Sequence, residues 1–237
     1  MGPVYLLTLR QLAGRWRLSI MTVLAALPIL IAVLTLRSGS APSVQEFEGV
    51  VFSAMLAGAI VPLVVLAIAS AAFGNELEDK TLANLTLSPI ARWRIAVPKL
   101  LATITIAAPF IAVSAIVTAH VAFLSDTRAT VAVTVSAVAG VALYASAFVW
   151  LGLVSPQAIG IGLLYIMLWE GFFSGYVSGV RFLSIRHYAI ALMHGLDERR
   201  FAGTDHLGLG AVIVTSVIVF AGFLLLSIRR LRTTDVP

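Results

Sequence analysis

Glu170 is an acidic residue inside a long apolar stretch, in the run LWEGFF at residues 168–173. A carboxylate within a membrane is energetically costly, and it usually faces a protein interior or a water-filled cavity. Three roles are therefore open for Glu170. It is a strut that hydrogen-bonds a Ser or Tyr of a neighbouring helix, it lines a cavity, or it couples the movement of protons or ions. Glu170 lies near the external boundary of the membrane instead if span five is a broken helix.

Glycines follow Glu170 at intervals of four residues, at Gly171, Gly175 and Gly179. Glycines with this spacing lie on one side of a helix and let a second helix approach backbone to backbone. We expect close helix packing there, with a partner helix from the same chain or from a second copy of it.

A second group of candidate functional residues lies in the polar segment 73–101, between two apolar stretches. Acids begin this segment, an apolar stripe follows, and bases end it. The three sets are Glu76, Glu78 and Asp79; Leu82, Leu85 and Ile90; and Arg92, Arg94 and Lys99. Acids suit the positive N-terminal end of a helix, and Pro89 ends a helix after Ser88. This order predicts a short helix at a membrane surface.

The polar segment has two interpretations. In the simpler one it is a solvated loop whose charges only set the orientation of the chain. A solvated loop has no use for regularly spaced apolar residues, however, so Leu82 and Leu85 favour insertion into a cleft of a partner.

Catalytic residues and metal ligands are not expected. The chain has no cysteine, and its 4 histidines lack the paired spacing of a zinc site. No acids, histidines and nucleophile converge at one depth of the apolar stretches, as an integral membrane enzyme would require. The sequence also lacks a GxxxxGKS or GxxxxGKT loop for nucleotide phosphates, so any ATP hydrolysis requires another chain.

Composition places these residues in a membrane protein. Hydrophobic residues make up 60% and charged residues 11% of the 237 residues, which excludes an ordinary soluble domain. The net charge of +5 lies largely at the ends and in the loops, where bases orient membrane proteins, so we do not expect nucleic-acid binding. We predict an all-α polytopic membrane protein with one transmembrane domain over residues 1–237.

Six apolar stretches approach the roughly 20 residues that a bilayer crossing requires. They are 19–36, 50–73, 100–124, 130–153, 158–179 and 207–228. Pro62, four residues after Gly58, is expected to loosen or kink the second span. A tight turn around Asp126 and Arg128 separates the third and fourth spans.

Two amphipathic segments are expected in the membrane interface. Residues 3–17 have apolar residues at helical spacing and predict an interfacial helix before the first span. Within the segment 181–206, residues 181–194 alternate apolar and basic character and predict a short anchor helix in the outer interface. His187 and His194 in that segment are expected to be solvated.

An even number of spans places both termini on one side of the membrane. Bases accumulate on that side, which predicts that it faces the cytoplasm. The cytoplasmic set is Arg10, Arg15, Arg17, Lys80, Arg92, Arg94, Lys99, Arg229, Arg230 and Arg232; the external set is Arg37, Arg128, Arg181, Arg186, Arg199 and Arg200.

The polar segment also carries the pattern Glu-x-Glu-x-x-Thr-Leu-x-x-Leu-x-x-Ser-Pro-x-x-Arg. Its members are Glu76, Glu78, Thr81, Leu82, Leu85, Ser88, Pro89 and Arg92. This pattern resembles the loop between spans two and three of ABC-2 type transporter permeases, and the resemblance covers most of the chain. Many members of that family have Gly directly before the Thr, where this chain has Lys80.

The resemblance implies a membrane-spanning permease subunit whose loop carries a coupling helix that meets an ABC ATPase. On this basis Glu76 and Glu78 make polar contacts with the ATPase or the base of the bundle. Leu82 and Leu85 insert into the ATPase, and Arg92 contacts a lipid headgroup or an acidic partner.

In the resembled family, spans two and five flank the transport pathway at a two-fold interface. This places Glu170, Phe172, Phe173 and Tyr176 near the substrate route and makes segment 181–206 a gate-like helix. The implied partners are ABC ATPase subunits and a second permease, in a homodimer or heterodimer. ATP and Mg are bound by the ATPase, and no cofactor is bound by this chain. The resemblance implies export across a prokaryotic inner (plasma) membrane, with both termini in the cytoplasm.

Two other functions are alternatives to the permease. An ion- or proton-coupled secondary transporter or channel would use Glu170, but such proteins have several intramembrane charges or paired broken helices. A receptor or assembly subunit with the same docking loop is also compatible with the sequence.

Overall fold

The computed structural model describes residues 2–37, 43–78, 91–124, 126–173, 184–201 and 208–233, and for residues 75–78 and 173 the backbone alone. Within these ranges the regular structure is entirely helical, as predicted. The elements are α1 (Gly2–Leu12), α2 (Arg15–Arg37), α3 (Val44–Glu46), η1 (Phe47–Ile60), α4 (Val61–Glu78), α6 (Trp93–Ala122), α7 (Thr127–Val154), α8 (Ala158–Leu164), η2 (Tyr165–Phe173), α10 (Ile185–Leu196) and α11 (Leu209–Thr233). The two η elements are π-helices, whose hydrogen bonds join residues five apart.

Of the described helices, five are long and apolar enough to cross a membrane. They are α2, the continuous helix of α3, η1 and α4, then α6, α7 and α11. These five coincide with predicted spans one, two, three, four and six. The chain is therefore a multi-pass membrane protein. The predicted fifth span has a different structure, and the count of six stays a prediction.

The second crossing changes helix type before Pro62. Proline has no backbone N–H, so it removes one hydrogen bond from a helix ladder. Before Pro62 the ladder is wide, because the Val61 N–H donates to the carbonyl of Leu56, five residues earlier. The loosening predicted at Pro62 thus takes the form of a π-helical segment on its N-terminal side.

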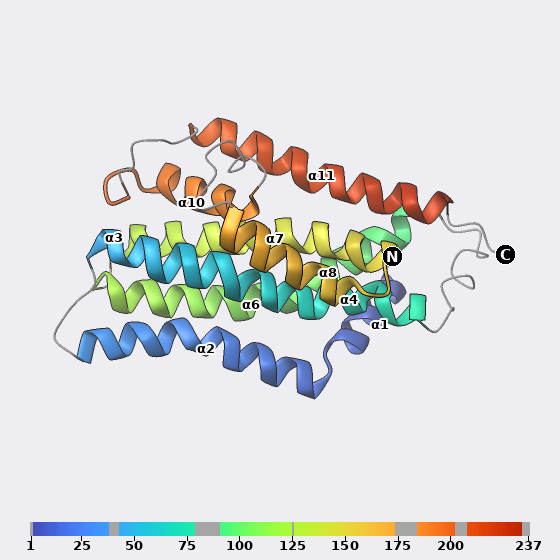
Figure 1. Ribbon diagram of the computed structural model, residues 1–237, viewed down its shortest axis with the longest axis horizontal. Helices are drawn as coiled ribbons and strands as arrows, with labels where there is room; N and C mark the ends of the chain where they lie inside the picture. The colour runs from blue at the N-terminus through green and yellow to red at the C-terminus, as the bar shows by residue number, and fades with distance from the viewer. Residues whose placement is uncertain are drawn as a thin grey trace.

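The bundle has a buried centre and two exposed flanks. In their most apolar windows, 67% of the second crossing and 61% of α7 are buried, against 22% of α2 and 11% of α11. Figure 1 shows α2 and α11 on opposite sides of the central helices. Their apolar outer surfaces are suited to lipid or to another membrane chain.

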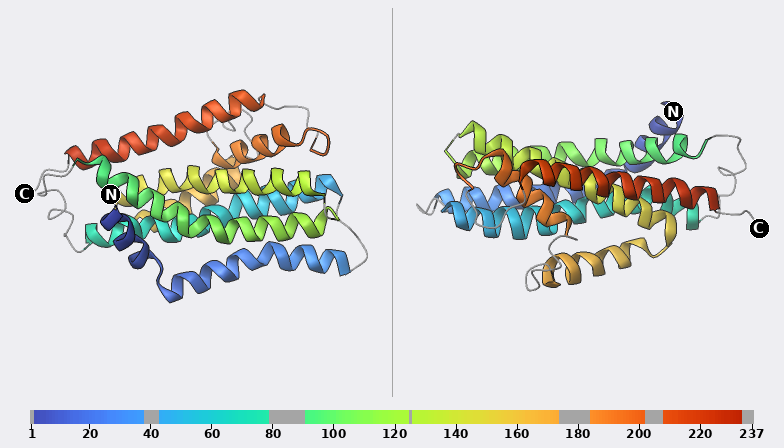
Figure 2. Two further views of the ribbon diagram at one scale, coloured as in Figure 1. Left: turned by 180° about the vertical axis from the view of Figure 1, so that it is seen from behind. Right: turned by 90° about the horizontal axis from the view of Figure 1, so that it is seen from above.

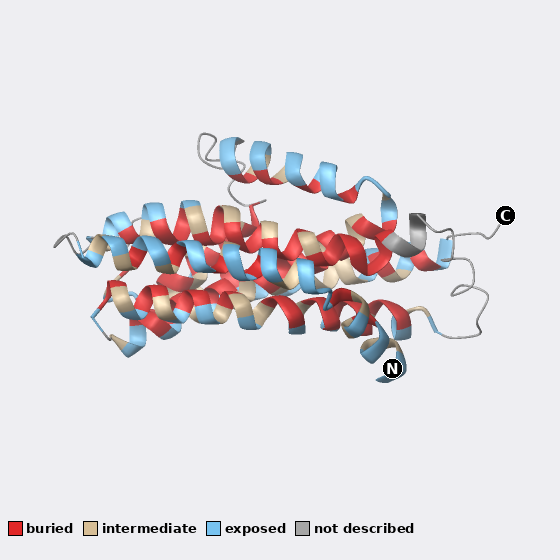
Figure 3. Ribbon diagram, turned by 90° about the horizontal axis from the view of Figure 1, so that it is seen from below, coloured by how far each residue is buried: buried red, intermediate tan, exposed pale blue. Residues whose placement is uncertain are grey.

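The helix formed by α8 and η2 runs along another side of the bundle (Figure 2, right panel). Its outer side is exposed and its inner side is buried (Figure 3). Gly162 on α8 lies so close to α4 that a Cβ atom there would be 2.4 Å from Cδ1 of Leu66. The absence of a side chain at Gly162 therefore lets α8 pack directly on α4.

Candidate functional site

The region of the predicted fifth span and the segment after it contain two shorter helical parts among the described residues. The part formed by α8 and η2 starts near the end of α7, and its described helix ends at Phe173 rather than at residue 179. The second part, α10, starts beside Ser53 in the middle of η1 and ends beside Glu48 near the start of η1. Figure 1 shows α10 along the end of the bundle farther from both termini. Interrupted helices of this kind line binding sites in many transporters.

Glu170 lies at the junction between these two parts and is fully buried. Its Oε1 accepts hydrogen bonds from the Tyr165 hydroxyl at 2.9 Å and from the Ile185 N–H at 3.0 Å. Its Oε2 accepts one from the Ser184 hydroxyl at 2.5 Å. Three donors around one carboxylate satisfy its need for hydrogen bonds in a medium without water. This geometry corresponds to the strut alternative, with a Tyr and a Ser as the partners.

Glu170 also closes the first turn of α10. Ser184 is the N-cap residue, and its hydroxyl accepts a hydrogen bond from the His187 N–H at 3.2 Å. The first N–H groups of a helix have no partner within the helix and carry partial positive charge. The carboxylate of Glu170 therefore lies where a negative charge stabilises α10, and it fixes that helix to η2.

Arg186 connects the two π-helices across this junction. Its Nε and Nη2 donate to the Ser53 hydroxyl of η1 at 3.1 and 2.7 Å, and its Nη1 donates to the main-chain oxygen of Glu170 at 3.0 Å. The prediction that Arg186 is an external loop base was wrong, because these acceptors hold it inside the bundle. Segments of π-helix often mark functional sites, and here two of them meet at one arginine.

Gly58 makes room for the Arg186 side chain. A Cβ atom at Gly58 would lie 2.8 Å from the main-chain oxygen of Ser53 and 3.3 Å from Cδ of Arg186. The first distance is too short for any real contact, and the obstacle is backbone. Glycine is therefore required by both the wide helix turn and the arginine that crosses it.

A large cavity lies beside the junction, between α7, α8, η2, α10 and α11. Its volume is about 490 Å³. Aromatic side chains make up more than half of its lining, and they are Phe148, Trp150, Tyr165, Trp169, Tyr188 and Phe223. Volumes of ~300–1,000 Å³ with apolar and aromatic walls are typical of small-molecule sites.

The helix α10, which the sequence predicts as an anchor in the outer interface, has protein on its apolar side. It packs on α7, η1 and α11, and half of its residues are buried, namely Ile185, Tyr188, Ala189, Ala191, Met193 and His194. The same amphipathic pattern fits a helix that faces lipid and one that faces protein, and here the apolar side faces protein. His194 is 3% exposed, and its Nε2 lies 2.6 Å from Oε1 of Glu48, so the prediction of a solvated histidine was also wrong.

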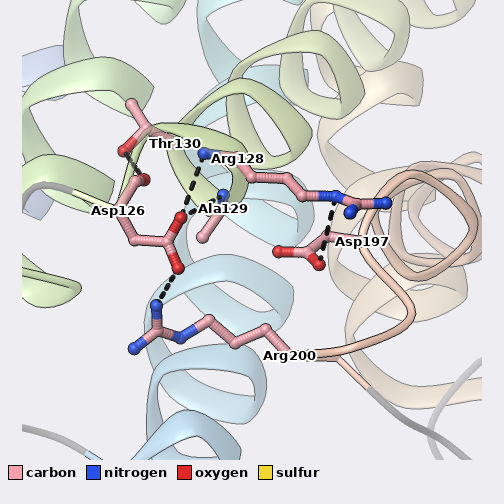
Figure 4. Close-up of polar contacts among 6 residues, drawn as sticks. All are labelled: Asp126, Arg128, Ala129, Thr130, Asp197 and Arg200. Carbon is pink, nitrogen blue, oxygen red and sulfur yellow. Dashed lines mark hydrogen bonds and ion pairs between the residues drawn. The ribbon is translucent and has the colours of Figure 1, made fainter.

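A group of charged residues, which we call the end clamp, closes the bundle at the far end of α10 (Figure 4). It consists of Asp126 and Arg128 at the turn between α6 and α7, and of Asp197 and Arg200 after α10. Arg200 pairs with Asp126, and Nε of Arg128 lies 3.6 Å from Oδ1 of Asp197. Oδ1 of Asp126 also accepts hydrogen bonds from the N–H groups of Arg128 at 3.0 Å and Ala129 at 3.3 Å, so it caps α7.

The electrostatics of the end clamp favour the ionised form of Asp126. Its pKa lies below the ordinary value, first because the Ala129 N–H donates to the carboxylate. Partial burial opposes this effect, whereas the Arg128 N–H and the Arg200 guanidinium reinforce it. Phe123 also contacts the end clamp, because its ring centre lies 4.7 Å from the guanidinium carbon of Arg200 in a cation–π contact.

The opposite end of the bundle contains the boundaries of the predicted coupling segment. Glu76 and Glu78 lie in the last turn of α4, and Arg92 directly precedes α6. The remaining predicted coupling residues, Thr81, Leu82, Leu85, Ser88 and Pro89, lie outside the described residues.

Lys99 joins α6 to α4 close to this segment. The sequence assigned it to the basic group at the membrane surface, but it is 2% exposed. Its ammonium donates to the carbonyl of Ala72 and lies 4.3 Å from the ring centre of Phe73. A buried ammonium needs such partners, and they tie the two helices that flank the coupling segment to each other.

The other predicted site residues lie on or after η2. Phe172 is 58% exposed, on the outer side of this helix. Gly171 lies in η2, and for Phe173 the backbone is described. Gly175, Tyr176 and Gly179 fall outside the described residues, so the proposed glycine packing surface stays a prediction.

Comparison with known proteins agrees with this architecture. The chain matches the family described as ABC-2 family transporter protein over residues 10–185. The matched range runs from the end of α1 to the first residue of α10, and so includes the coupling segment and Glu170. No curated protein matches the chain. Since the matched range covers well over half of the 237 residues, the chain belongs to the ABC-2 family of transporter proteins.

Proposed function

We propose that this chain is the membrane-spanning permease subunit of an ATP-driven ABC exporter. The observation that carries the proposal is the ABC-2 family match over residues 10–185. Membrane proteins of this family are permease subunits that work with ABC ATPase subunits. In this assembly ATP and Mg belong to the ATPase, and the permease forms the pathway for the substrate.

The ATPase docks at residues 76–92. Support comes from the position of the helix ends: α4 ends and α6 begins at the same end of the bundle as both termini (Figure 1). This is also the end to which the sequence analysis assigns the larger set of basic residues, the set that predicts the cytoplasmic side. Leu82 and Leu85 provide the apolar contact, while Glu76, Glu78 and Arg92 provide polar ones.

Movement at the docking segment reaches the bundle through α4 and α6. Because Lys99 joins α6 to Ala72 and Phe73 of α4, these two helices respond together. Transport requires two packings of the helices that nucleotide stabilises to different extents. A second permease completes the pathway, and the exposed apolar sides of α2 and α11 are surfaces that such a partner would cover.

A proton- or ion-coupled transporter is the alternative function. It requires Glu170 to exchange protons or ions during transport. The contacts of Glu170 favour the permease, because Tyr165, Ser184 and Ile185 already donate to its carboxylate. The glutamate therefore has a structural task in holding α10.

The test is purification of the chain from its native membrane in mild detergent, followed by an ATP hydrolysis assay of the eluate. We expect an ABC ATPase to copurify with the wild type and to be lost from the Leu82→Asp/Leu85→Asp variant. The matched control, Leu82→Met/Leu85→Met, keeps the apolar character and should retain the ATPase. Folded wild-type protein without any ATPase, or equal recovery with all three chains, would refute the docking proposal.

A further inference from the structure

We propose that the aromatic cavity beside Glu170 is a binding site for lipophilic organic cations. The cavity is built by α7, α8, η2, α10 and α11. This proposal names a ligand class for the permease and rests on the proposed function for the step from binding to transport. Binding itself does not require the ATPase.

The walls of the cavity are arranged as an aromatic box. The ring of Phe148 meets the ring of Tyr165 edge to face, with centres 6.2 Å apart, and Trp150 lies 5.7 Å from Phe223. Trp169 and Tyr188 complete the box from η2 and α10. Aromatic faces carry negative partial charge and attract a cation that has lost its water shell. Six such rings around about 490 Å³ therefore favour a cation with an apolar body.

Glu170 adds a negative charge behind one wall. The Tyr165 hydroxyl donates to its carboxylate at 2.9 Å, while the ring of Tyr165 lines the cavity. A phenol that donates to a carboxylate becomes more electron-rich, because hydrogen bonds in a medium of low dielectric polarise their partners. An organic anion of the same shape would be repelled by the aromatic faces and by this carboxylate.

A second cavity provides the contrast. It lies between α2 and α6, has a volume of about 320 Å³, and its lining of Thr22, Ala25, Ala26, Ile29, Pro109, Phe110, Val113 and Ser114 contains one aromatic residue. Such walls suit an acyl chain and give no preference for positive charge. The two cavities thus differ in chemistry and not only in place.

The cavity also provides its own optical probe. Two of the chain's 4 tryptophans, Trp150 and Trp169, line it. The other two, Trp16 and Trp93, are exposed and lie elsewhere. Changing Trp16 and Trp93 to Phe leaves a chain whose tryptophan fluorescence reports on the cavity alone.

The experiment is a titration of this chain, purified in phosphatidylcholine nanodiscs without ATPase, with tetraphenylphosphonium and with tetraphenylborate. The two ions have nearly the same size and shape but opposite charge. We expect saturable quenching by the phosphonium, and affinity weakened about five- to thirtyfold in Phe223→Leu and Tyr188→Leu, as loss of one desolvated cation–π contact predicts. Glu170→Gln should weaken phosphonium binding in the same direction. Phe110→Leu is the matched control variant in the second cavity. Empty nanodiscs measure the partition of the two ions into lipid.

The outcomes separate the proposals. Borate binding as tight as phosphonium binding, or affinity unchanged in both cavity variants, would overturn the cation site. Quenching that does not saturate would also overturn it, because the phosphonium would then be partitioning into the bilayer and not filling a site. Saturable phosphonium binding in a chain that recovers no ATPase would leave the site standing and remove the permease assignment instead.

Discussion

The helix α10 is held by charged groups at both ends, and the surroundings of the two groups differ. At its start, Glu170 is fully buried and accepts from three donors of the chain. At its far end, three side chains of the end clamp are partly open to solvent, with 58% exposure for Arg128, 37% for Asp126 and 33% for Arg200, whereas Asp197 is 3% exposed. Hydrogen bonds in a dry interior are costly to lose, whereas exposed ion pairs compete with water and salt. We therefore expect the junction to contribute more than the end clamp to holding α10 in place.

Glu170→Ala is expected to have the largest effect. It leaves the buried donors of Tyr165, Ser184 and Ile185 without their acceptor and removes the negative charge at the start of α10. We expect a loss of roughly 2–5 kcal/mol of unfolding free energy, from the cost of unsatisfied buried groups and of a lost helix cap. Reversible unfolding in mixed micelles measures it. The control Glu170→Gln keeps an acceptor oxygen and should lose less; equal losses would show that the hydrogen bonds are not what holds α10.

Gly58→Ala is expected to have a smaller but clear effect. The added methyl group meets the main-chain oxygen of Ser53 at 2.8 Å, so η1 must shift and the contact with Arg186 must change. Overpacking of this kind costs about 1–3 kcal/mol. Gly140→Ala is the matched control, because its Cβ atom would lie 3.7 Å from Cγ1 of Val61, an ordinary contact. If both variants unfold alike in the same micelles, the main-chain oxygen of Ser53 does not require glycine at position 58.

Asp126→Asn in the end clamp is expected to have the smallest effect on stability, and this effect should depend most on pH and salt. Because the pKa of Asp126 is lowered in the folded chain, its ionised form stabilises the fold above the unfolded pKa of about 3.8. This contribution is lost as pH falls through the lower, folded pKa. Wild-type stability should therefore fall below pH 3.8 more steeply than that of Asp126→Asn, and 1 M salt, with a Debye length of about 3 Å, should reduce the difference. Parallel pH profiles for the two chains would exclude a role of this carboxylate.

Much of the fold was predictable, because length and hydropathy define a membrane crossing. Five predicted spans coincide with long helices, and Asp126 marked a turn correctly. A broken fifth span was only one of the alternatives that the sequence left open. An apolar stretch over 158–179 is compatible with one straight helix, and only the later position of Arg186 beside Ser53 reveals that α10 returns to the centre of the bundle.

The candidate site was predictable in part, because Glu170 stands out by its charge. The hydrogen-bond partners of Glu170 do not stand out in the sequence. Tyr165 lies five residues before it, and an ideal α-helix would place the two about 140° apart, so their hydrogen bond depends on the π-helix of η2. Lys99 and Arg186 were assigned to loops by charge alone. Both are stabilised inside the bundle by carbonyl or hydroxyl oxygens from helices distant in sequence.

We propose that α10 is the second half of a fifth crossing that begins with α8 and η2. The absence of native cysteine allows a direct measurement, with single cysteines placed at Ala189, Ala191 and Leu124 and a membrane-impermeant thiol reagent applied to each side of vesicles. Leu124 is 75% exposed at the turn near the end clamp and serves as the labelled control. We predict that cysteines at positions 189 and 191 stay unlabelled from both sides while position 124 reacts from one. Labelling of positions 189 and 191 at the rate of position 124 would place α10 in the interface and contradict the account.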